Sequence, residues 1–265
     1  MPGHLKARRL TGVRQEIKFL LDPADGPAIR SAIESRVPTK KFGGFDSSFR
    51  ISVYLDTTDF VMARRGLVNG TQTTKLRLKK YYQIENRQTI FDPFYWVESK
   101  TRSGNMVEKV RFQIPEEEIA NVLNDSNWEQ DTAVTPEERI ARDTLSALRL
   151  GQPLIPLFVA HYRRYTYQDE ASTLRITLDD ACSFHLPPRG IFTPAIPICS
   201  RRYLPPPLST EARWIMEIKS TGLAPSWISE LTASAPEADY SKFVTGVHAL
   251  EHLGMFENKG TQPCL

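Results

Sequence analysis

Apolar and polar residues alternate along several stretches of this chain, so that every second side chain is hydrophobic. A period of two is typical of a strand with one apolar and one polar face. The stretches that show it cover residues 13–21, 49–57, 73–82, 95–101, 105–114, 156–167, 173–182 and 212–220. Eight strands are enough to close an antiparallel barrel. The pattern therefore predicts an α+β fold, an eight-stranded antiparallel β-barrel tunnel with helices packed on its outside.

Helical patterns lie between and after these strands. Residues 135–138, Thr-Pro-Glu-Glu, supply an N-cap, a proline at the first helical position and a capping-box glutamate. A helical apolar stripe follows them. Further helices are predicted over residues 24–36, 115–124, 225–234 and 240–253, the last of them ended by Gly254 in the left-handed conformation.

Proline marks one long insertion within the fold. Seven of the 19 prolines fall in residues 187–207, which predicts an extended loop without regular structure. The segments on both sides of it have the pattern of strands of one sheet, so we expect a single domain over residues 1–265. Its core should cover about residues 13–253, followed by a flexible tail over 255–265.

A carboxylate stands two residues before a lysine in three of the strands. The three copies are Glu16-Ile17-Lys18, Glu98-Ser99-Lys100 and Glu217-Ile218-Lys219. Residues i and i+2 of a strand share a face, so each copy directs an acid and a base into the same space. The same phase of the eight strands carries thirteen cations, namely Arg14, Lys18, Arg50, Lys75, Arg77, Lys79, Lys100, Lys109, Arg111, Arg164, Arg175, Arg213 and Lys219. Five acids share that phase, namely Glu16, Asp56, Glu98, Asp179 and Glu217.

Net charge alone conceals this concentration. The 265 residues include 34 Lys and Arg against 31 Asp and Glu, a net charge of +3, which argues against a nucleic-acid binder. The strand face, by contrast, carries an excess of eight positive charges, which leaves 3 − 8 = −5 for the rest of the chain.

An ordinary solvated sheet face also alternates in this way, but such faces mix signs, because like charges on neighbouring strands repel. A face rich in cations is therefore better explained by a bound polyanion, and closure of the sheet would place it inside a barrel. Phosphate suits Arg and Lys best, and the acids then suit a divalent cation, Mg²⁺ or Mn²⁺, shared with phosphate oxygens.

Two further features concern the compartment. The chain has no run of 18 or more apolar residues, so we expect no membrane segment. Its three cysteines, Cys182, Cys199 and Cys264, form no C-x-x-C pair, which favours a reduced, cytoplasmic protein over a disulfide framework or a zinc site. The sequence does not indicate an oligomeric state.

The order of these motifs resembles a known family. The E-x-K at the start, the YLDT of residues 54–57 and the KLRLKKY run at 75–81 are similar to the VTC domain, the polyphosphate polymerase branch of the triphosphate tunnel metalloenzymes (CYTH-like proteins). The similarity continues through 98–100, 109–111, 162–164, 174–179, 217–219 and 240–243, and spans about residues 13–250.

The resemblance implies a function and a set of site residues. Family members bind ATP and polyphosphate or triphosphate in the tunnel, and eukaryotic members transfer the γ-phosphate of ATP onto a polyphosphate chain with Mn²⁺ or Mg²⁺. The implied phosphate-binding residues are Lys18, Lys75, Arg77, Lys79, Lys100, Lys109, Arg111, Arg164, Arg175, Lys219 and Lys242. Catalysis is expected from Lys18, Arg77, Lys79, Lys100, Arg164, Arg175 and Glu217, and metal binding from Glu217 with Glu16 or Glu98.

Three positions depart from the family pattern. Lys79 stands where the family often has arginine, and Asp239 stands where some active members are basic. The related hydrolases begin with E-x-E-x-K, whereas Arg14 occupies the first of these glutamate positions here, which favours the polymerase branch.

Hydrolysis of tripolyphosphate or nucleoside triphosphates, and polyphosphate binding without catalysis, remain alternatives, since all three functions need the same cationic cradle. Tyr162, Tyr165 and Tyr167 are candidates either for stacking on a nucleotide base or for core packing.

Overall fold

One antiparallel sheet organises the described part of the chain. The computed structural model describes residues 8–10, 15–68, 72–104, 106–124, 135–192 and 200–256. The eight long strands are β2 (Gln15–Leu21), β3 (Ser47–Thr57), β4 (Gln72–Glu85), β6 (Tyr95–Ser103), β7 (Met106–Ile114), β8 (Leu154–Gln168), β9 (Leu174–His185) and β11 (Trp214–Ser220). All eight predicted strands are thus present. Three short strands were not predicted, namely β1 (Arg8–Leu10), β5 (Gln88–Phe91) and β10 (Ser209–Glu211).

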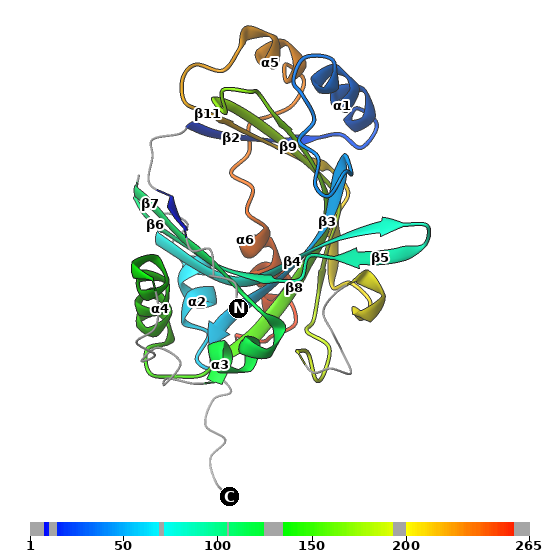
Figure 1. Cartoon of the computed structure of the whole chain (residues 1–265). Helices are drawn as coiled ribbons and strands as arrows, with labels where there is room; N and C mark the ends of the chain where they lie inside the picture. Colours follow the sequence, from blue (N-terminus) through cyan, green and yellow to red (C-terminus); the bar gives the residue numbers. More distant parts are fainter. Residues whose placement is uncertain are drawn as a thin grey trace, which may run out of the picture.

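The sheet curls around a central axis. Its hydrogen-bonded order is β1-β7-β6-β4-β3-β8-β9-β11-β2, with β5 added to β4 and β10 added to β9. Figure 1 looks into this ring, where the edge formed by β7 faces the edge formed by β2. Among the described residues no backbone pairing joins these two edges. The predicted α+β tunnel architecture is confirmed, in the form of a strongly curled antiparallel sheet with helices outside.

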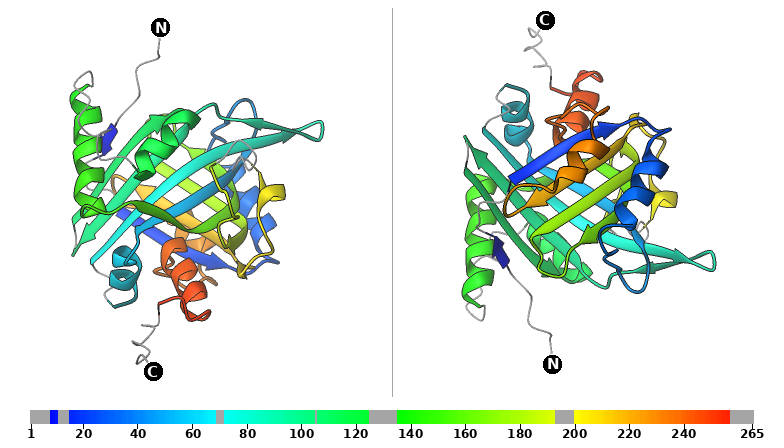
Figure 2. Two further views of the ribbon diagram at one scale, coloured as in Figure 1. Left: turned by 90° about the horizontal axis from the view of Figure 1, so that it is seen from below. Right: turned by 90° about the horizontal axis from the view of Figure 1, so that it is seen from above.

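Helices cover the convex side in two groups (Figures 1 and 2). Helices α1 (Gly26–Glu34) and α5 (Ser226–Leu231) lie over β2, β9 and β11, where Ile33 and Ile228 share a core with Leu178 and Met216. The second group covers another part of the convex side and consists of α2 (Val61–Val68), the 3-10 turn η1 (Glu116–Glu118), α3 (Ile119–Asn124) and α4 (Pro136–Arg149). The apolar phase of the strands therefore faces outward under helices, as expected for a sheet with a polar interior.

Helix α2 was not predicted, and a buried carboxylate explains where it begins. Asp56, at the end of β3, accepts backbone hydrogen bonds from Met62 (3.0 Å) and Ala63 (2.8 Å) in the first turn of the helix. An acid at a helix N-terminus accepts hydrogen bonds from unpaired N–H groups and interacts favourably with the positive end of the helix dipole. Asp56 thus belongs to a helix cap and not to the charged concave face, which corrects its assignment from the strand pattern.

The segment rich in proline differs in part from expectation. It contains the 3-10 turn η3 (Arg201–Tyr203) where no regular structure was predicted. Residues 193–199 within it, and residues 257–265 of the expected tail, lie outside the described residues.

Helix α6 (Lys242–Glu251) closes over one end of the sheet (Figure 2). Phe243 packs on Tyr54 of β3 and Phe158 of β8, with ring centroids 5.5 and 6.2 Å apart. A Cβ at Gly246 would collide with the Phe158 ring, so glycine permits this close approach. Gly254 has φ +73° and follows the helix end, as the sequence predicted. The packing brings the N-terminus of α6 against charged residues of the sheet.

No helix among the described residues combines the length and apolarity needed to cross a membrane.

Candidate functional site

Strand register assembles the charged residues on the concave side. Arg77 of β4 lies opposite Glu98 of β6, and Glu98 lies opposite Arg111 of β7. Because side chains alternate along each strand, the other charged residues of this phase share the same side. We define the tunnel face by twelve cations, Lys18, Arg50, Lys75, Arg77, Lys79, Lys100, Lys109, Arg111, Arg164, Arg175, Lys219 and Lys242, and four acids, Glu16, Glu98, Asp179 and Glu217.

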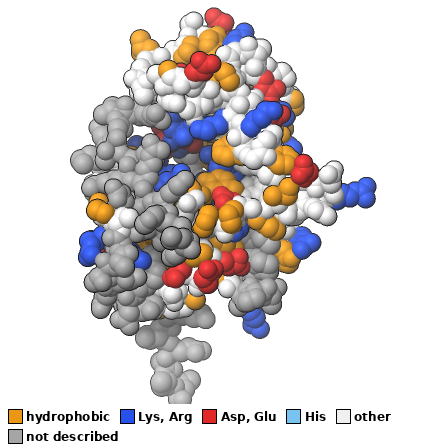
Figure 3. Space-filling view, viewed as in Figure 1, with side chains coloured by type: hydrophobic (Ala, Val, Ile, Leu, Met, Phe, Trp, Pro, Cys, Tyr) orange, Lys and Arg blue, Asp and Glu red, His pale blue; other side chains and the backbone are white. Residues whose placement is uncertain are grey.

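The tunnel face carries 12 − 4 = 8 more positive than negative charges. Figure 3 shows Lys and Arg side chains gathered around a hollow in the view along the ring. The excess equals the one expected from the strand pattern, although its members differ. Lys242 joins the set, Arg213 pairs instead with Glu211 (2.8 Å) off this face, and Arg14 lies outside the described residues.

Glu98 is a buried carboxylate surrounded by cations. Its oxygens lie 2.6 Å from Arg77 Nη2, 3.8 Å from Lys79 Nζ, 3.4 Å from Lys109 Nζ and 3.7 Å from Arg111 Nε. Burial alone would raise the pKa of Glu98, but these cations hold it well below its usual range. Four of the predicted phosphate-binding residues are therefore brought together on one counter-ion. For a metal to bind Glu98, it would have to compete with all four.

Asp179 is the second buried counter-ion. It accepts a two-point contact from Arg164 on β8, including Nη2 to Oδ2 at 2.6 Å, and a contact of 2.6 Å from Lys242 Nζ of α6. Burial opposes ionisation of Asp179, yet Arg164 and Lys242 lower its pKa to about 2. This pair of bonds ties the N-terminus of α6 to the sheet. A neighbouring bond, from Lys75 Nζ to Ser241 Oγ at 2.8 Å, does the same from β4.

Burial lowers the pKa of four lysines of the tunnel face, Lys75, Lys79, Lys100 and Lys109. Burial, together with the neighbouring charges of Lys100, Lys18 and Arg77, lowers the pKa of Lys75 to about 8. Burial also lowers the pKa of Lys109 to about 8, in spite of Glu98 beside it. An anion placed among these residues would relieve the repulsion that lowers both values.

Glu16 and Glu217 form the third acidic group, and they share one lysine. Lys219 Nζ lies 2.7 Å from Glu16 Oε2 and 2.6 Å from Glu217 Oε1. Glu16 is also approached by Lys18 at 3.3 Å and by Lys100 at 3.7 Å. Burial opposes ionisation of Glu217, but Lys219 and Arg164 hold its pKa far below the usual range. Both carboxylates are thus ionised at neutral pH and lie next to one another.

This pair fits a divalent cation that is shared with a substrate. Mg²⁺ binds through one or two carboxylates plus phosphate oxygens and retained water. In the described ranges, no group of three or more His, Cys, Asp or Glu residues is arranged to hold a metal. The donors of Glu16 and Glu217 are therefore suited to a metal completed by phosphate, and not to a cage built from protein alone.

The remaining predicted residue, Arg175, lies opposite Lys219 of β11 on the tunnel face. All predicted phosphate-binding residues thus reach one concave surface from seven strands and one helix. Sequence reasoning had missed the partners of some of them. Tyr54, which accepts a hydrogen bond from Arg77 Nη1 at 3.2 Å, and Ser241, which caps α6, were not singled out. For Ser241, the available signal was a serine, a residue favoured at N-caps, at the start of the helix predicted over residues 240–253, which begins at Lys242 in the structure.

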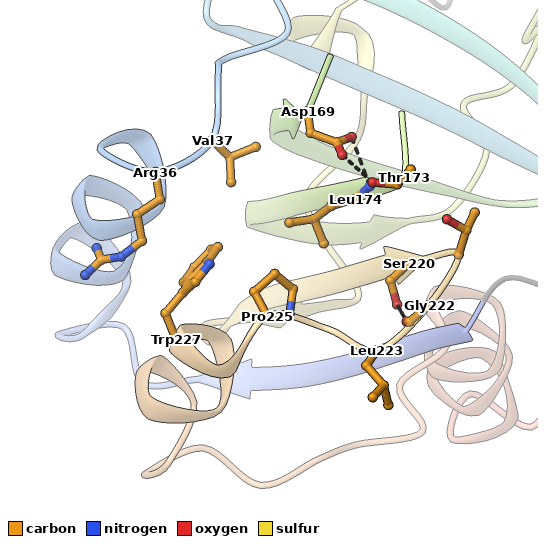
Figure 4. Close-up of a pocket in the computed structure, with 11 residues that line it drawn as sticks. Arg36, Val37, Asp169, Thr173, Leu174, Ser220, Gly222, Leu223, Pro225 and Trp227 are labelled. Atoms are coloured by element: carbon orange, nitrogen blue, oxygen red, sulfur yellow. Dashed lines mark hydrogen bonds between the residues drawn. The ribbon is translucent and has the colours of Figure 1, made fainter. Parts of the chain in front are cut away.

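A cavity of about 420 Å³ lies outside the tunnel, beside α1 and α5 (Figure 4). Its apolar lining comes from Val37, Leu174, Pro225 and Trp227. The Asp169 carboxylate accepts a hydrogen bond of 2.9 Å from the Leu174 N–H. This cavity contains none of the tunnel-face residues.

A curled antiparallel sheet with a basic concave face and outer helices is the architecture of tunnel-fold proteins that handle phosphoryl groups. The chain belongs to the VTC domain family, whose model matches residues 13–251.

Solved structures resemble the same architecture. One is a putative adenylate cyclase from Bacillus halodurans, with 13% identity, a TM-score of 0.51, and coverage of 89% of this chain and 97% of that chain. Another is a putative adenylyl cyclase from Hippeastrum described as having a dominant triphosphatase activity, with 15% identity, a TM-score of 0.49, and coverage of 88% and 95%. No curated protein matches the chain.

Proposed function

We propose that this protein is an ATP-polyphosphate phosphotransferase that moves the γ-phosphate of ATP onto a polyphosphate chain inside the tunnel. The observation that supports it most is the tunnel face, with eight more cationic than anionic groups in a chain of the VTC domain family. A linear polyphosphate carries about one negative charge for each phosphate, so it can meet many of these cations at once.

In this proposal the cations exchange their present acidic partners for phosphate oxygens. Arg77, Arg164 and Arg175 offer planar forks that bind phosphate in a bidentate manner, whereas the lysines act as compact charges. Lys18, Lys79 and Lys100 complete the catalytic set around the acceptor and the γ-phosphate. Phosphoryl transfer needs little covalent help from the protein, so alignment and charge stabilisation are sufficient and no protein nucleophile is required.

A divalent metal, Mn²⁺ or Mg²⁺, would be held by Glu217 and Glu16 together with phosphate oxygens. When bound, it would supply positive charge at the oxygens that become more negative during transfer. Lys219, which now lies between the two carboxylates, would then be available to a phosphate.

The product formed from ATP distinguishes the possible activities. The protein is incubated with ATP and Mn²⁺, and polyphosphate is separated from free phosphate. Long chains support the transferase, whereas phosphate alone would show hydrolysis by the same tunnel. Tight tripolyphosphate binding without either product would indicate a binding module. Arg164→Gln should abolish product, while Arg213→Gln, an arginine paired with Glu211 off the tunnel face, should leave it unchanged.

Ligand-induced stabilisation tests the tunnel independently of turnover. Tripolyphosphate at about 100 times its dissociation constant should stabilise the fold by roughly 2.7 kcal/mol, because it binds only the folded state. Thermal unfolding with and without the ligand measures this. An unchanged melting temperature for the wild type would contradict phosphate binding in the tunnel.

A further inference from the structure

Aromatic side chains collect on the concave side at the end away from α6. Lys75, whose amine contacts Ser241 of α6, marks one end of β4, and Lys79 lies four residues further along, about 13 Å away. Trp96 of β6 lies directly opposite Lys79, and Tyr81 is the next concave residue of β4. This end therefore differs from the rest of the tunnel face, because large π-surfaces lie among its cations.

Trp96 is held in place by an arginine. The guanidinium carbon of Arg111 lies 3.6 Å from the centre of the Trp96 ring, and Arg111 is itself fixed 3.7 Å from Glu98. Stacking of this kind is favourable and orients the indole. Trp96 is only half-buried, so part of its surface is exposed, and it lies opposite Lys79 of the tunnel face.

The tyrosines considered from the sequence do not have this property. Tyr162 is 1%, Tyr165 4% and Tyr167 0% exposed. Tyr165 and Tyr167 lie in the core beneath α1, so the packing interpretation of these residues is the correct one. A base would have to displace core residues to reach Tyr165 and Tyr167. To reach Tyr162 it would have to displace Lys242 and Arg164, which lie 4.5 and 5.4 Å from the centre of that ring.

We propose that the Trp96 ring, with Arg111 behind it, is the platform on which the base of a nucleoside triphosphate stacks. This rests on the proposed use of ATP. The base lies at the end of the tunnel away from α6, and the triphosphate extends from it toward Arg77 and Lys109. Aromatic stacking tolerates any base, since every base has a π-face. The platform therefore selects nucleotides over inorganic tripolyphosphate without selecting strongly among bases.

Substitution of Trp96 distinguishes the contribution of the base to ATP affinity from that of the phosphates. Trp96→Leu keeps an apolar side chain but removes the π-surface, and binding of ATP and of tripolyphosphate is measured by calorimetry. ATP should bind roughly tenfold more weakly, a change worth about 1.4 kcal/mol, while tripolyphosphate affinity should change by less than about twofold. Trp96→Phe should retain part of the ATP affinity. It also provides a second test if the leucine variant does not fold.

Trp227 offers a matched control. It is also half-buried and has an arginine over its ring, Arg36 at 5.5 Å, but it lines the outer cavity (Figure 4). Trp227→Leu should leave both affinities unchanged.

The possible outcomes test the Trp96 platform independently of the proposed transferase activity. An equal loss of ATP and tripolyphosphate affinity in Trp96→Leu would overturn the platform, since Trp96 would then only position Arg111. Unchanged ATP affinity in this variant would overturn it too, while leaving the phosphate-binding tunnel intact. A selective loss of ATP affinity in a protein that makes no polyphosphate would support the platform and contradict the transferase.

Discussion

Two wings of the sheet carry the same E-x-K motif in different surroundings. On the β4–β6–β7 wing, Glu98 is 3% exposed and contacts four cations. On the β2–β11 wing, Glu217 and Glu16 lie side by side and share Lys219. The motif alone therefore does not define a role, because the strands on either side of it decide how many charges each carboxylate meets.

Strand register accounts for the difference. Glu98 has Arg77 opposite it on one side and Arg111 on the other, so both cross-strand neighbours are cationic. Glu217 has Lys18 on one side but Thr177 on the other. Directly opposed residues interact most strongly across a sheet. Glu98 thus has a cationic neighbour on both adjacent strands, whereas Glu217 has one on β2 only.

The comparison predicts that the Glu98 wing depends most on its acid for stability. In Glu98→Gln, the buried Lys79 and three partly buried cations lose their common counter-ion, and the free energy of unfolding should fall by about 3–5 kcal/mol. Chemical denaturation measures the loss. Tripolyphosphate should restore much of it, because phosphate supplies the missing negative charge, and refolding in its presence provides material if the variant does not fold alone.

Glu211 is the control for this substitution. It pairs with Arg213 at 2.8 Å, off the tunnel face, where the arginine side chain is 51% exposed. Glu211→Gln should change stability by no more than about 1 kcal/mol. Similar losses in both variants would remove the distinction between the Glu98 cluster and an ordinary surface ion pair.

On the β2–β11 wing, loss of the acid should instead lower the rate of turnover. Glu217→Gln removes a carboxylate suited to a shared metal but leaves the phosphate-binding cations in place. Metal-dependent turnover should fall by about 100-fold, the scale of losing one preorganised charge contact. Tripolyphosphate affinity, measured without metal, should stay the same or rise slightly, since a negative charge has been removed. Equal losses of turnover and binding would assign Glu217 to the phosphate cradle.

The architecture could be predicted from the sequence because an alternation with period two identifies the two faces of a strand. All eight long strands and every tunnel-face cation on them were predicted in this way, and Lys242 came from the resemblance to the VTC domain. Helix α2 was missed, since its start depends on the buried Asp56 carboxylate and not on an apolar period.

The partners of each charge could not be predicted. The strand order β4-β3-β8-β9-β11-β2 joins several segments far apart in the chain, so nothing local places Glu217 beside Glu16 or Lys242 beside Asp179. Trp96 illustrates the same point for an apolar group. Its alternation with Val97 shows only that it lies on the concave side, whereas the Arg111 contact that makes it distinctive comes from pairing with β7.

The smallest predicted effect concerns pH and tests two lysines of the β4–β6–β7 wing, which lie in one cross-strand row on either side of Lys100. Lys75 beside α6 and Lys109 beside Glu98 have pKa values of about 8 in the free protein. Bound phosphate favours the charged lysine and raises both values, so binding takes up protons above about pH 8. Tripolyphosphate affinity should therefore fall by about tenfold for each of these two lysines between about pH 7 and pH 9.

Arginine substitutions isolate the contribution of each lysine, because arginine stays charged throughout this range. Lys75→Arg and Lys109→Arg should each remove about one tenfold step from the pH dependence, as measured by calorimetry with tripolyphosphate from about pH 6.5 to pH 9. Titration of the ligand itself is common to all variants and cancels in the comparison. Removing Glu98 should lower the pKa of Lys109 further and move only its step to lower pH, since Lys75 does not contact that acid. If the two steps moved together, Lys75 and Lys109 would titrate as one coupled group and not as two independent lysines.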